Sequence, residues 1–176
     1  IAVSDGRYRG TSIVSPDITD AQFQRLHDGG IRAVRFNFVK HLESVPEPQV
    51  VTRMAERVKS MGWHLVVHLD AVDIDELAPL LLGLPVPFLI DHMARVKASD
   101  GLDQQPFRTL LDLLQHDNAW VKICGGERIS SDGPPFHDAV PFAQALIATA
   151  PERVLWGTDW PHPNVKNMPN DGALVD

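Results

Sequence analysis

The stretch that decides the fold runs from Arg153 to Pro163 and reads RVLWGTDWPHP. Its apolar part, VLW, has the length of a short buried strand. The two prolines cannot continue a strand, and Pro161 biases Trp160 away from a helix. Asp159 is therefore expected at the C-terminal end of a strand, where ligands and catalytic groups collect in alternating strand–helix chains. Taken alone, an aspartate in this position is more often a loop or capping residue.

The composition excludes several classes of partner. The chain has 176 residues, the length of one domain, which is enough to bury a hydrophobic core. Apolar residues make up 44% of it and charged residues 22%. A net charge of −7 argues against a nucleic-acid or anionic-membrane surface. Cys124 is the only cysteine, so an intrachain disulfide is excluded and a reducing cytosol is compatible. With neither a secretory signal nor a membrane-length apolar run, we expect a cytoplasmic protein.

Strand-like and helix-like segments alternate along the whole chain. Thr19 and Gln22 form a capping-box pattern at the start of the first helix. Residues 125–135 are rich in glycine, serine and proline and are expected to form a long loop. The expected strands are residues 9–14, 31–39, 63–69, 86–90, 120–124 and 153–158, and the expected helices are residues 19–28, 47–61, 73–82, 106–114 and 138–149.

Strict alternation predicts an α/β fold with a parallel sheet and helices outside it. Two architectures remain, an open doubly wound sheet or part of a (β/α)8 TIM barrel. Residues 14–17 read VSPD, which is not the glycine-rich phosphate turn of a Rossmann sheet. A whole barrel takes about 250 residues, so a barrel reading leaves this chain short by about two β/α units and a closing helix.

Polar side chains recur where the expected strands end. Arg35 and Asn37 share one face of the second strand, and His68 ends the third. The fourth strand leads directly to His92, and the fifth leads to Arg128. In a parallel barrel these ends converge with Asp159 on one mouth. Two arginines, two imidazoles and one carboxylate suit an anionic substrate and a hydrolytic step.

Each of these residues also has a purely structural interpretation. Arg35 alone is more often part of an ion pair, although an arginine inside an apolar strand needs a partner. His68 alone would be a hydrogen-bonded core histidine, and Arg128 a solvated loop residue. Asp91 and His92 could be a helix-capping acid and a surface imidazole. Further residues with structural interpretations are His64, Lys122 as a paired or barrel-lining residue, and Cys124 as a small core residue.

The joint pattern favours hydrolysis over these separate interpretations. Asp159 could take a proton from water while His92 or an arginine stabilises the oxyanion formed at a carbonyl. His68, His92 and Asp159 are also competent metal ligands, so metal chemistry stays open at this point.

Four segments together resemble the amidohydrolase superfamily (amidohydrolase family 2). They are VRFNFV at 34–39, IDHM at 90–93, VKI at 121–123 with ERIS at 127–130, and WGTDWPHP at 156–163. The resemblance covers nearly the whole chain and is nearest to the lactone hydrolases related to 2-pyrone-4,6-dicarboxylate lactonase. It implies a single domain over residues 1–176, a distorted (β/α)8 barrel in which the strands present are strands 3 to 8. The first two strands and the C-terminal helix of the barrel are then expected outside this sequence.

The resemblance also implies roles. Asp159 would activate water and His92 would lie near the scissile carbonyl, while Arg35 and Arg128 would hold a substrate carboxylate. The implied substrate-binding set is completed by Asn37, His41, His68 and His162. Three features depart from the pattern that the resemblance implies. The His-x-His pair of the family's first strand is absent from this sequence, and His41 stands where the dicarboxylate lactonase has an arginine. His68 occupies the place of a histidine found in metal-using relatives.

Three functional hypotheses follow. The first is a hydrolase that opens a lactone of a small anionic or sugar-acid substrate through water activated by an aspartate. The second is a metal-dependent decarboxylase or hydrolase of the same superfamily, and the third is an inactive or binding-only fragment. The expected cofactor is none, or a single divalent metal such as zinc held by His68 and Asp159. The expected partner is a small carboxylate or lactone, with no nucleic acid or membrane, and a homo-oligomer is compatible with the sequence.

Overall fold

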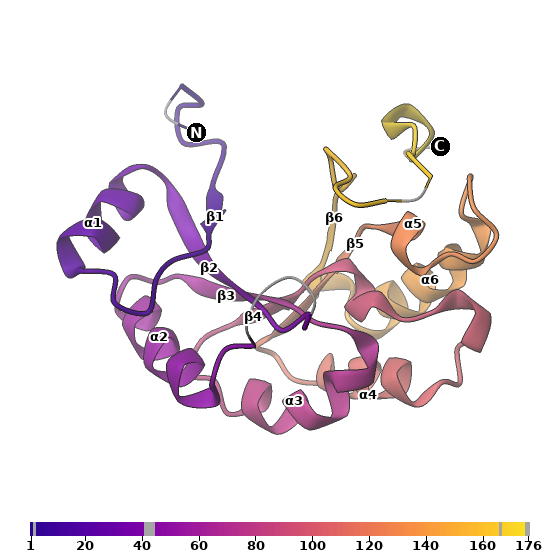
Figure 1. The fold of residues 1–176 in the computed structure, drawn as a ribbon, viewed down its shortest axis with the longest axis horizontal. Helices are drawn as coiled ribbons and strands as arrows, with labels where there is room; N and C mark the ends of the chain where they lie inside the picture. Colours follow the sequence, from indigo (N-terminus) through magenta and orange to yellow (C-terminus); the bar gives the residue numbers. More distant parts are fainter. Residues whose placement is uncertain (2, 41–44, 166, 175–176) are drawn as a thin grey trace.

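A computed structural model describes residues 1, 3–40, 45–165 and 167–174. Six strands form one parallel sheet in chain order (Figure 1). Sequential order is that of a barrel, whereas a doubly wound sheet changes direction in its strand order. The predicted α/β fold is confirmed as a six-stranded half-barrel. The strands are β1 (Gly10–Ser12), β2 (Ile31–Asn37), β3 (His64–His68), β4 (Phe88–Ile90), β5 (Ala119–Ile123) and β6 (Val154–Trp156).

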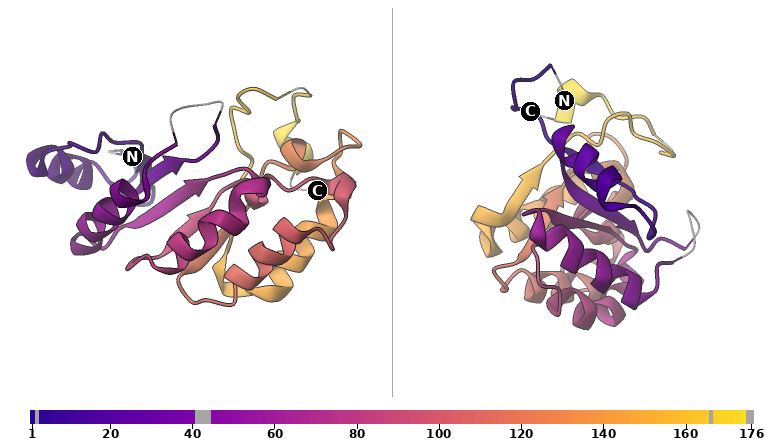
Figure 2. Two further views of the ribbon diagram at one scale, coloured as in Figure 1. Left: turned by 60° about the horizontal axis from the view of Figure 1, so that its bottom comes forward. Right: turned by 90° about the vertical axis from the view of Figure 1, so that its left-hand side faces the viewer.

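Helices connect the strands and cover one face of the sheet. Helices α2, α3 and α4 lie side by side along that face, with the C-terminal segment η6 on the opposite side (Figures 1 and 2). In the described part of the chain, every helix is too short or too polar to cross a membrane. The α-helices are α1 (Asp20–Asp28), α2 (Pro48–Ser60), α3 (Ile74–Leu82), α4 (Gln105–Leu113), α5 (Gly126–Ile129) and α6 (Val140–Thr149). The 3-10 segments are η1 (Ala71–Asp73), η2 (His92–Arg95), η3 (Ala98–Asp100), η4 (His137–Ala139), η5 (Pro151–Arg153) and η6 (Asp171–Leu174).

Most element boundaries follow the sequence pattern. The capping box of α1 is confirmed, because Thr19 Oγ1 accepts from the backbone N–H of Gln22 and the Gln22 side chain accepts from the backbone N–H of Thr19. The strands are shorter than expected; β2 ends at Asn37 and β6 spans only Val154–Trp156. The expected loop at 125–135 contains α5, a helix of 4 residues that periodicity cannot detect at that length.

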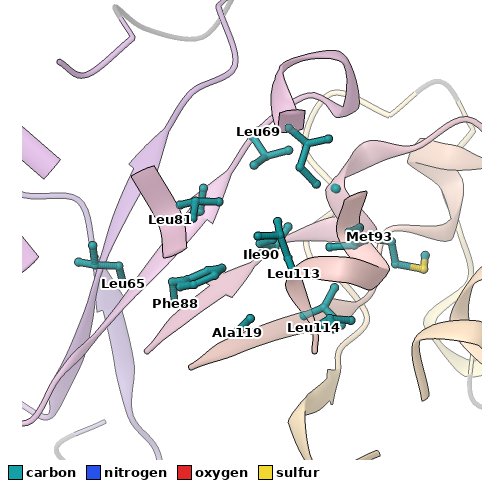
Figure 3. Packing of buried hydrophobic residues seen from close by; sticks show 14 of the residues in the cluster. Leu65, Leu69, Leu81, Phe88, Ile90, Met93, Leu113, Leu114 and Ala119 are labelled. Atoms are coloured by element: carbon teal, nitrogen blue, oxygen red, sulfur yellow. The ribbon is translucent and has the colours of Figure 1, made fainter. Parts of the chain in front are cut away.

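The core lies between the sheet and the helices on its outer face. Alternate strand residues, such as Leu65 in β3 with Phe88 and Ile90 in β4, point to this side and are fully buried (Figure 3). They pack with helix residues that include Leu81 of α3 and Leu113 of α4. Each fully buried side chain of this size stabilises the fold by roughly 1.5–3 kcal/mol relative to an exposed one.

The strand residues that alternate with these core residues point to the inside of the half-barrel. Ala33, Val66 and Leu89 form a small separate apolar cluster there, with Trp120 packed against it. This split between the two faces follows from the alternation of side chains along a strand. Polar residues on the inner face are therefore carried by a scaffold whose opposite face is anchored in the core.

A buried carboxylate connects three of these strands near their C-terminal ends. Asp91 follows β4 and has a side chain only 2% exposed; its Oδ1 lies 2.6 Å from Lys122 Nζ of β5 and its Oδ2 3.5 Å from Arg35 Nε of β2. Burial alone raises the pKa of Asp91, but Lys122, His92 and Arg35 outweigh burial and hold the pKa below its usual value. Arg35 and Lys122 are thus ion-paired, as their structural interpretations expected. Asp91 is their partner and makes no capping hydrogen bond with its side chain.

We expect Asp91→Asn to lower the free energy of unfolding by about 2–3 kcal/mol. Removing one partner of a buried pair costs roughly 3–5 kcal/mol, and the two cations here keep some contact with water. Urea denaturation at neutral pH measures the change, with exposed Asp103→Asn as the matched control. Equal stability of the two variants would contradict the role of Asp91.

Candidate active site

Asp159 lies directly beyond β6, at the edge of the sheet that the sequence predicted. Its backbone is left-handed, with φ of 68°, which is uncommon for a residue other than glycine. Arg128, from α5, donates to Asp159 Oδ2 from Nε at 2.7 Å and approaches the same oxygen with Nη2 at 2.6 Å. The Arg128 side chain is 13% exposed, so the interpretation of a solvated loop arginine is wrong.

Gly125 allows these groups to meet. It is left-handed, with φ of 71°, and immediately precedes α5. A Cβ atom at this position would lie 3.1 Å from both Nδ1 of His92 and Cδ of Arg128. Glycine is therefore required for the close approach of β5, His92 and α5.

His92 faces the carboxylate from the end of β4. Its Nδ1 lies 3.7 Å from Asp159 Oδ1 and 3.2 Å from Cys124 Sγ. The residue is 5% exposed, which corrects the interpretation of a surface imidazole. Burial lowers the pKa of His92 to about 4, against the opposing charges of Asp91 and Asp159. His92 is therefore a neutral imidazole at neutral pH.

The turn after β4 is a run of left-handed residues. His92, Met93, Ala94 and Arg95 have φ values of 53°, 50°, 56° and 52°. Each such residue costs about 1–2 kcal/mol of backbone strain, which surrounding contacts must offset. Met93 and Ala94 are buried in the main core, and this anchoring presents His92 and Arg95 beside the inner face.

His68 is joined to this group from β3. Its Nδ1 lies 3.3 Å from Asn37 Oδ1 on β2, and its Nε2 lies 3.5 Å from Nη1 of Arg95. Its ring meets that of His92 edge to face, with centroids 5.1 Å apart. Burial lowers the pKa of His68 to about 3, helped by the positive charge of Arg35. Asn37 and His68 are partners in the pairing of β2 with β3, a contact between strands that the sequence did not predict.

Arg95 is a site residue that the sequence analysis missed. Its Nε lies 3.0 Å from Asp70 Oδ1, and its side chain is 24% exposed. An arginine three residues after the strand-end histidine carries no pattern that marks it, because only the left-handed turn brings it to His68.

Arg35 opens onto a cavity inside the half-barrel. The cavity measures about 370 Å³ and is lined by β1, β2, β3, β5 and Asp91. Arg35 and Lys122 both line it, with side chains 30% exposed. Two cations and one carboxylate therefore leave a net positive charge at this wall.

His162 does not line this cavity and lies beside a second acidic group. Its Nε2 lies 3.1 Å from Asp171 Oδ1, and its Nδ1 lies 3.9 Å from Glu127 Oε1. Glu127 was missed by the sequence analysis, although it directly precedes Arg128. Burial, then the nearby charge of Asp159, raises the pKa of Glu127. The remaining expected substrate-binding residue, His41, lies outside the described residues.

Two groups of possible metal ligands include Asp159. One is His92, Cys124 and Asp159, and the other is Glu127, Asp159 and His162. His68 belongs to neither group, and the Arg95 guanidinium beside its Nε2 opposes a cation there. These neighbours argue against His68 as a ligand, and its expected role with a metal stays a prediction.

Comparison with known proteins identifies the family of this chain. The amidohydrolase family model matches residues 1–176. The chain belongs to the amidohydrolase family. Among its relatives are a 2-pyrone-4,6-dicarboxylate hydrolase of Comamonas testosteroni, 43% identical over 98% of this chain and 60% of the relative. A 4-sulfomuconolactone hydrolase of Hydrogenophaga intermedia is 38% identical over 98% of this chain and 58% of the relative.

The fold of this amidohydrolase chain also matches solved structures. A protein of Pseudomonas putida assigned as a 2-pyrone-4,6-dicarboxylic acid hydrolase aligns with a TM-score of 0.84 and 30% identity. The alignment covers 97% of this chain and 63% of that one. The chain thus spans about 60% of the length of the curated relatives it matches.

The buried histidines predict a loss of stability in mild acid. In the folded chain the pKa values of His68 and His92 are about 3 and about 4, below the usual 6.5. As the pH falls below 6.5, these histidines therefore bind protons in the unfolded chain but stay neutral in the folded one. Each ring then lowers the free energy of unfolding by about 2 kcal/mol at pH 5. Urea denaturation at pH 7.5 and 5 measures this fall.

His68→Gln is expected to lose about 2 kcal/mol less between these two pH values than the parent chain. The matched control is His116→Gln, which changes an exposed histidine. The same fall in the parent, His68→Gln and His116→Gln would contradict the burial argument.

Proposed function

We propose that the protein opens a lactone that carries a carboxylate or similar anionic group, with Asp159 as the base and His92 at the carbonyl oxygen. The observation that carries the proposal is that the two oxygens of the Asp159 carboxylate have different neighbours. Oδ2 is held by Arg128, while Oδ1 faces Nδ1 of His92 at 3.7 Å. One oxygen anchors the side chain, and the other is available to a water molecule beside the imidazole.

The protonation state of His92 suits a hydrogen-bond donor to a carbonyl. A ring with a pKa of about 4 is neutral at neutral pH and keeps one N–H. Burial raises the pKa of Cys124 to about 12, so its thiol also keeps its proton. The Cys124 thiol, 3.2 Å from Nδ1, can donate to that nitrogen, and the tautomer in this proposal then carries its proton on Nε2. Nε2–H is then the group that stabilises an oxyanion.

The reaction needs one water and no redox partner. Asp159 accepts a proton as the water oxygen bonds to the lactone carbonyl carbon. The ring C–O bond then breaks, and the proton held by Asp159 passes to the departing oxygen. The products are one carboxylic acid and one hydroxyl group, which balances the water consumed.

Positive side chains around the mouth support an anionic substrate. Arg35 and Lys122 line the inner cavity, and Arg95 lies beside His68 at the end of β3. The names of the two curated relatives describe lactones with carboxylate or sulfonate groups. This charge is local, because the chain as a whole has a net charge of −7.

Asp159→Asn is expected to lower turnover of the preferred lactone by about 10²–10⁴-fold, because an amide cannot accept the proton. Hydrolysis of pyrone carboxylates, muconolactones and aldonolactones by the full-length protein measures the effect. The control is Asp112→Asn on the exposed face of α4, with circular dichroism to check folding. A folded Asp159→Asn protein with near-normal turnover would remove Asp159 from the base role.

Arg35→Gln is expected to raise KM for an anionic lactone about 10–100-fold, which corresponds to one charge-assisted hydrogen bond. The KM for a neutral lactone of similar size should change much less. Arg108→Gln, which changes an exposed arginine of α4, is the matched control. An equal rise for the charged and neutral lactones would show that Arg35 acts only through folding.

A further inference from the structure

Asp70 and Arg95 form an ion pair beside His68, just beyond the ends of β3 and β4. Nε of Arg95 lies 3.0 Å from Asp70 Oδ1, and Nη1 of the same guanidinium lies 3.5 Å from Nε2 of His68. The carboxylate takes Nε, which leaves Nη1 for the imidazole. One rigid, planar group therefore connects a carboxylate to a ring nitrogen, and its shape fixes the angle between the two contacts.

The backbone that carries this ion pair is anchored in the core. Leu69, which precedes Asp70, is fully buried, and so are Ala94 and Val96 on either side of Arg95. The two charged side chains themselves are only partly exposed. Because close-packed interiors deform little, the ion pair reaches the imidazole from fixed points on the backbone.

Arg95 determines which nitrogen of His68 carries the proton. A guanidinium has only donors, so the Nε2 atom that faces Nη1 must present its lone pair. The proton of the neutral ring is then on Nδ1, which lies 3.3 Å from Oδ1 of Asn37. The Asn37 amide must present its oxygen to this proton, because its nitrogen would bring two donors together.

Both ring nitrogens of His68 are engaged in this arrangement. Nδ1–H donates to Asn37 and the Nε2 lone pair accepts from Arg95, so the ring keeps no N–H for the carbonyl oxygen of a substrate. Its other contact is with the His92 ring, which it meets edge to face at an interplanar angle of 72°. Edge-to-face contacts between rings have a preferred geometry, so a fixed His68 ring also orients the ring of His92.

We propose that Arg95, oriented by Asp70, is a positioning residue that holds His68 in the Nδ1–H tautomer and thereby fixes the plane of the His92 ring. The inference rests on the proposed lactone hydrolysis, in which His92 stabilises the oxyanion. It gives His68 a supporting role in place of direct contact with the substrate. The competing explanation is that Arg95 binds the anionic group of the substrate.

The first measurement is the tautomer of His68 in the full-length protein, from two-bond ¹H–¹⁵N correlation spectra of a sample labelled with ¹⁵N-histidine. The His68→Gln variant identifies the signals of this ring. We expect the Nδ1–H form in the parent protein, loss of this preference in Arg95→Met, and its return in Arg95→Lys, which keeps a charged donor. Arg108→Met, which changes an exposed arginine of α4, should leave the signals unchanged. A proton on Nε2 of His68 in the parent protein would overturn the proposal, whether or not the variants fold.

Kinetics separate positioning from substrate binding, with circular dichroism to confirm that each variant is folded. Arg95→Met should lower kcat about 10–100-fold while KM changes by less than about twofold, because a misplaced donor slows the chemical step. Arg95→Lys should recover most of the lost kcat. A higher KM for an anionic lactone, with kcat and the His68 tautomer unchanged, would overturn the proposal in favour of substrate binding. The tautomer is measured without substrate, so absence of turnover would contradict the proposed function and leave the spectra to decide the role of Arg95.

Discussion

The carboxylate of Asp91 connects the strands that carry the site. It lies at the end of β4 and receives positive charge from Lys122 on β5 and Arg35 on β2. Its burial would raise its pKa without those cations, so the pairing and the packing of the strand ends depend on each other. His92 follows Asp91 directly in the chain. The same pairing therefore sets where the imidazole enters the mouth.

The candidate site residues that follow the strands lie on backbone with strained, left-handed φ values. His92 to Arg95 and Asp159 all have left-handed φ values, and the core under Met93 and Ala94 offsets that strain. The result is a set of side chains held at short distances without long flexible loops. Arg128 illustrates the outcome, because two of its nitrogens reach one oxygen of Asp159. Rigid placement of this kind is what the proposed base and oxyanion donor require.

Elements with a regular periodicity could be predicted from the sequence. Alternating segments predicted the parallel sheet and the outer helices. Prediction failed where contacts are made by short irregular turns. Arg95 and Glu127 were missed because one follows a left-handed turn and the other opens a helix of 4 residues. The pairing of Asp91 was not predicted, because its two partners come from other strands, far away in the chain.

The sequence by itself determined the fold class, the family and the positions of Asp159 and His92 at strand ends, because these follow from local patterns along the chain. The tertiary structure alone decided the partners. It placed Arg128 on Asp159 and His162 beside Glu127, and it buried both His68 and His92. The physical reason is that charge pairing and burial depend on distances between strands, and such distances leave no periodic trace in the order of residues.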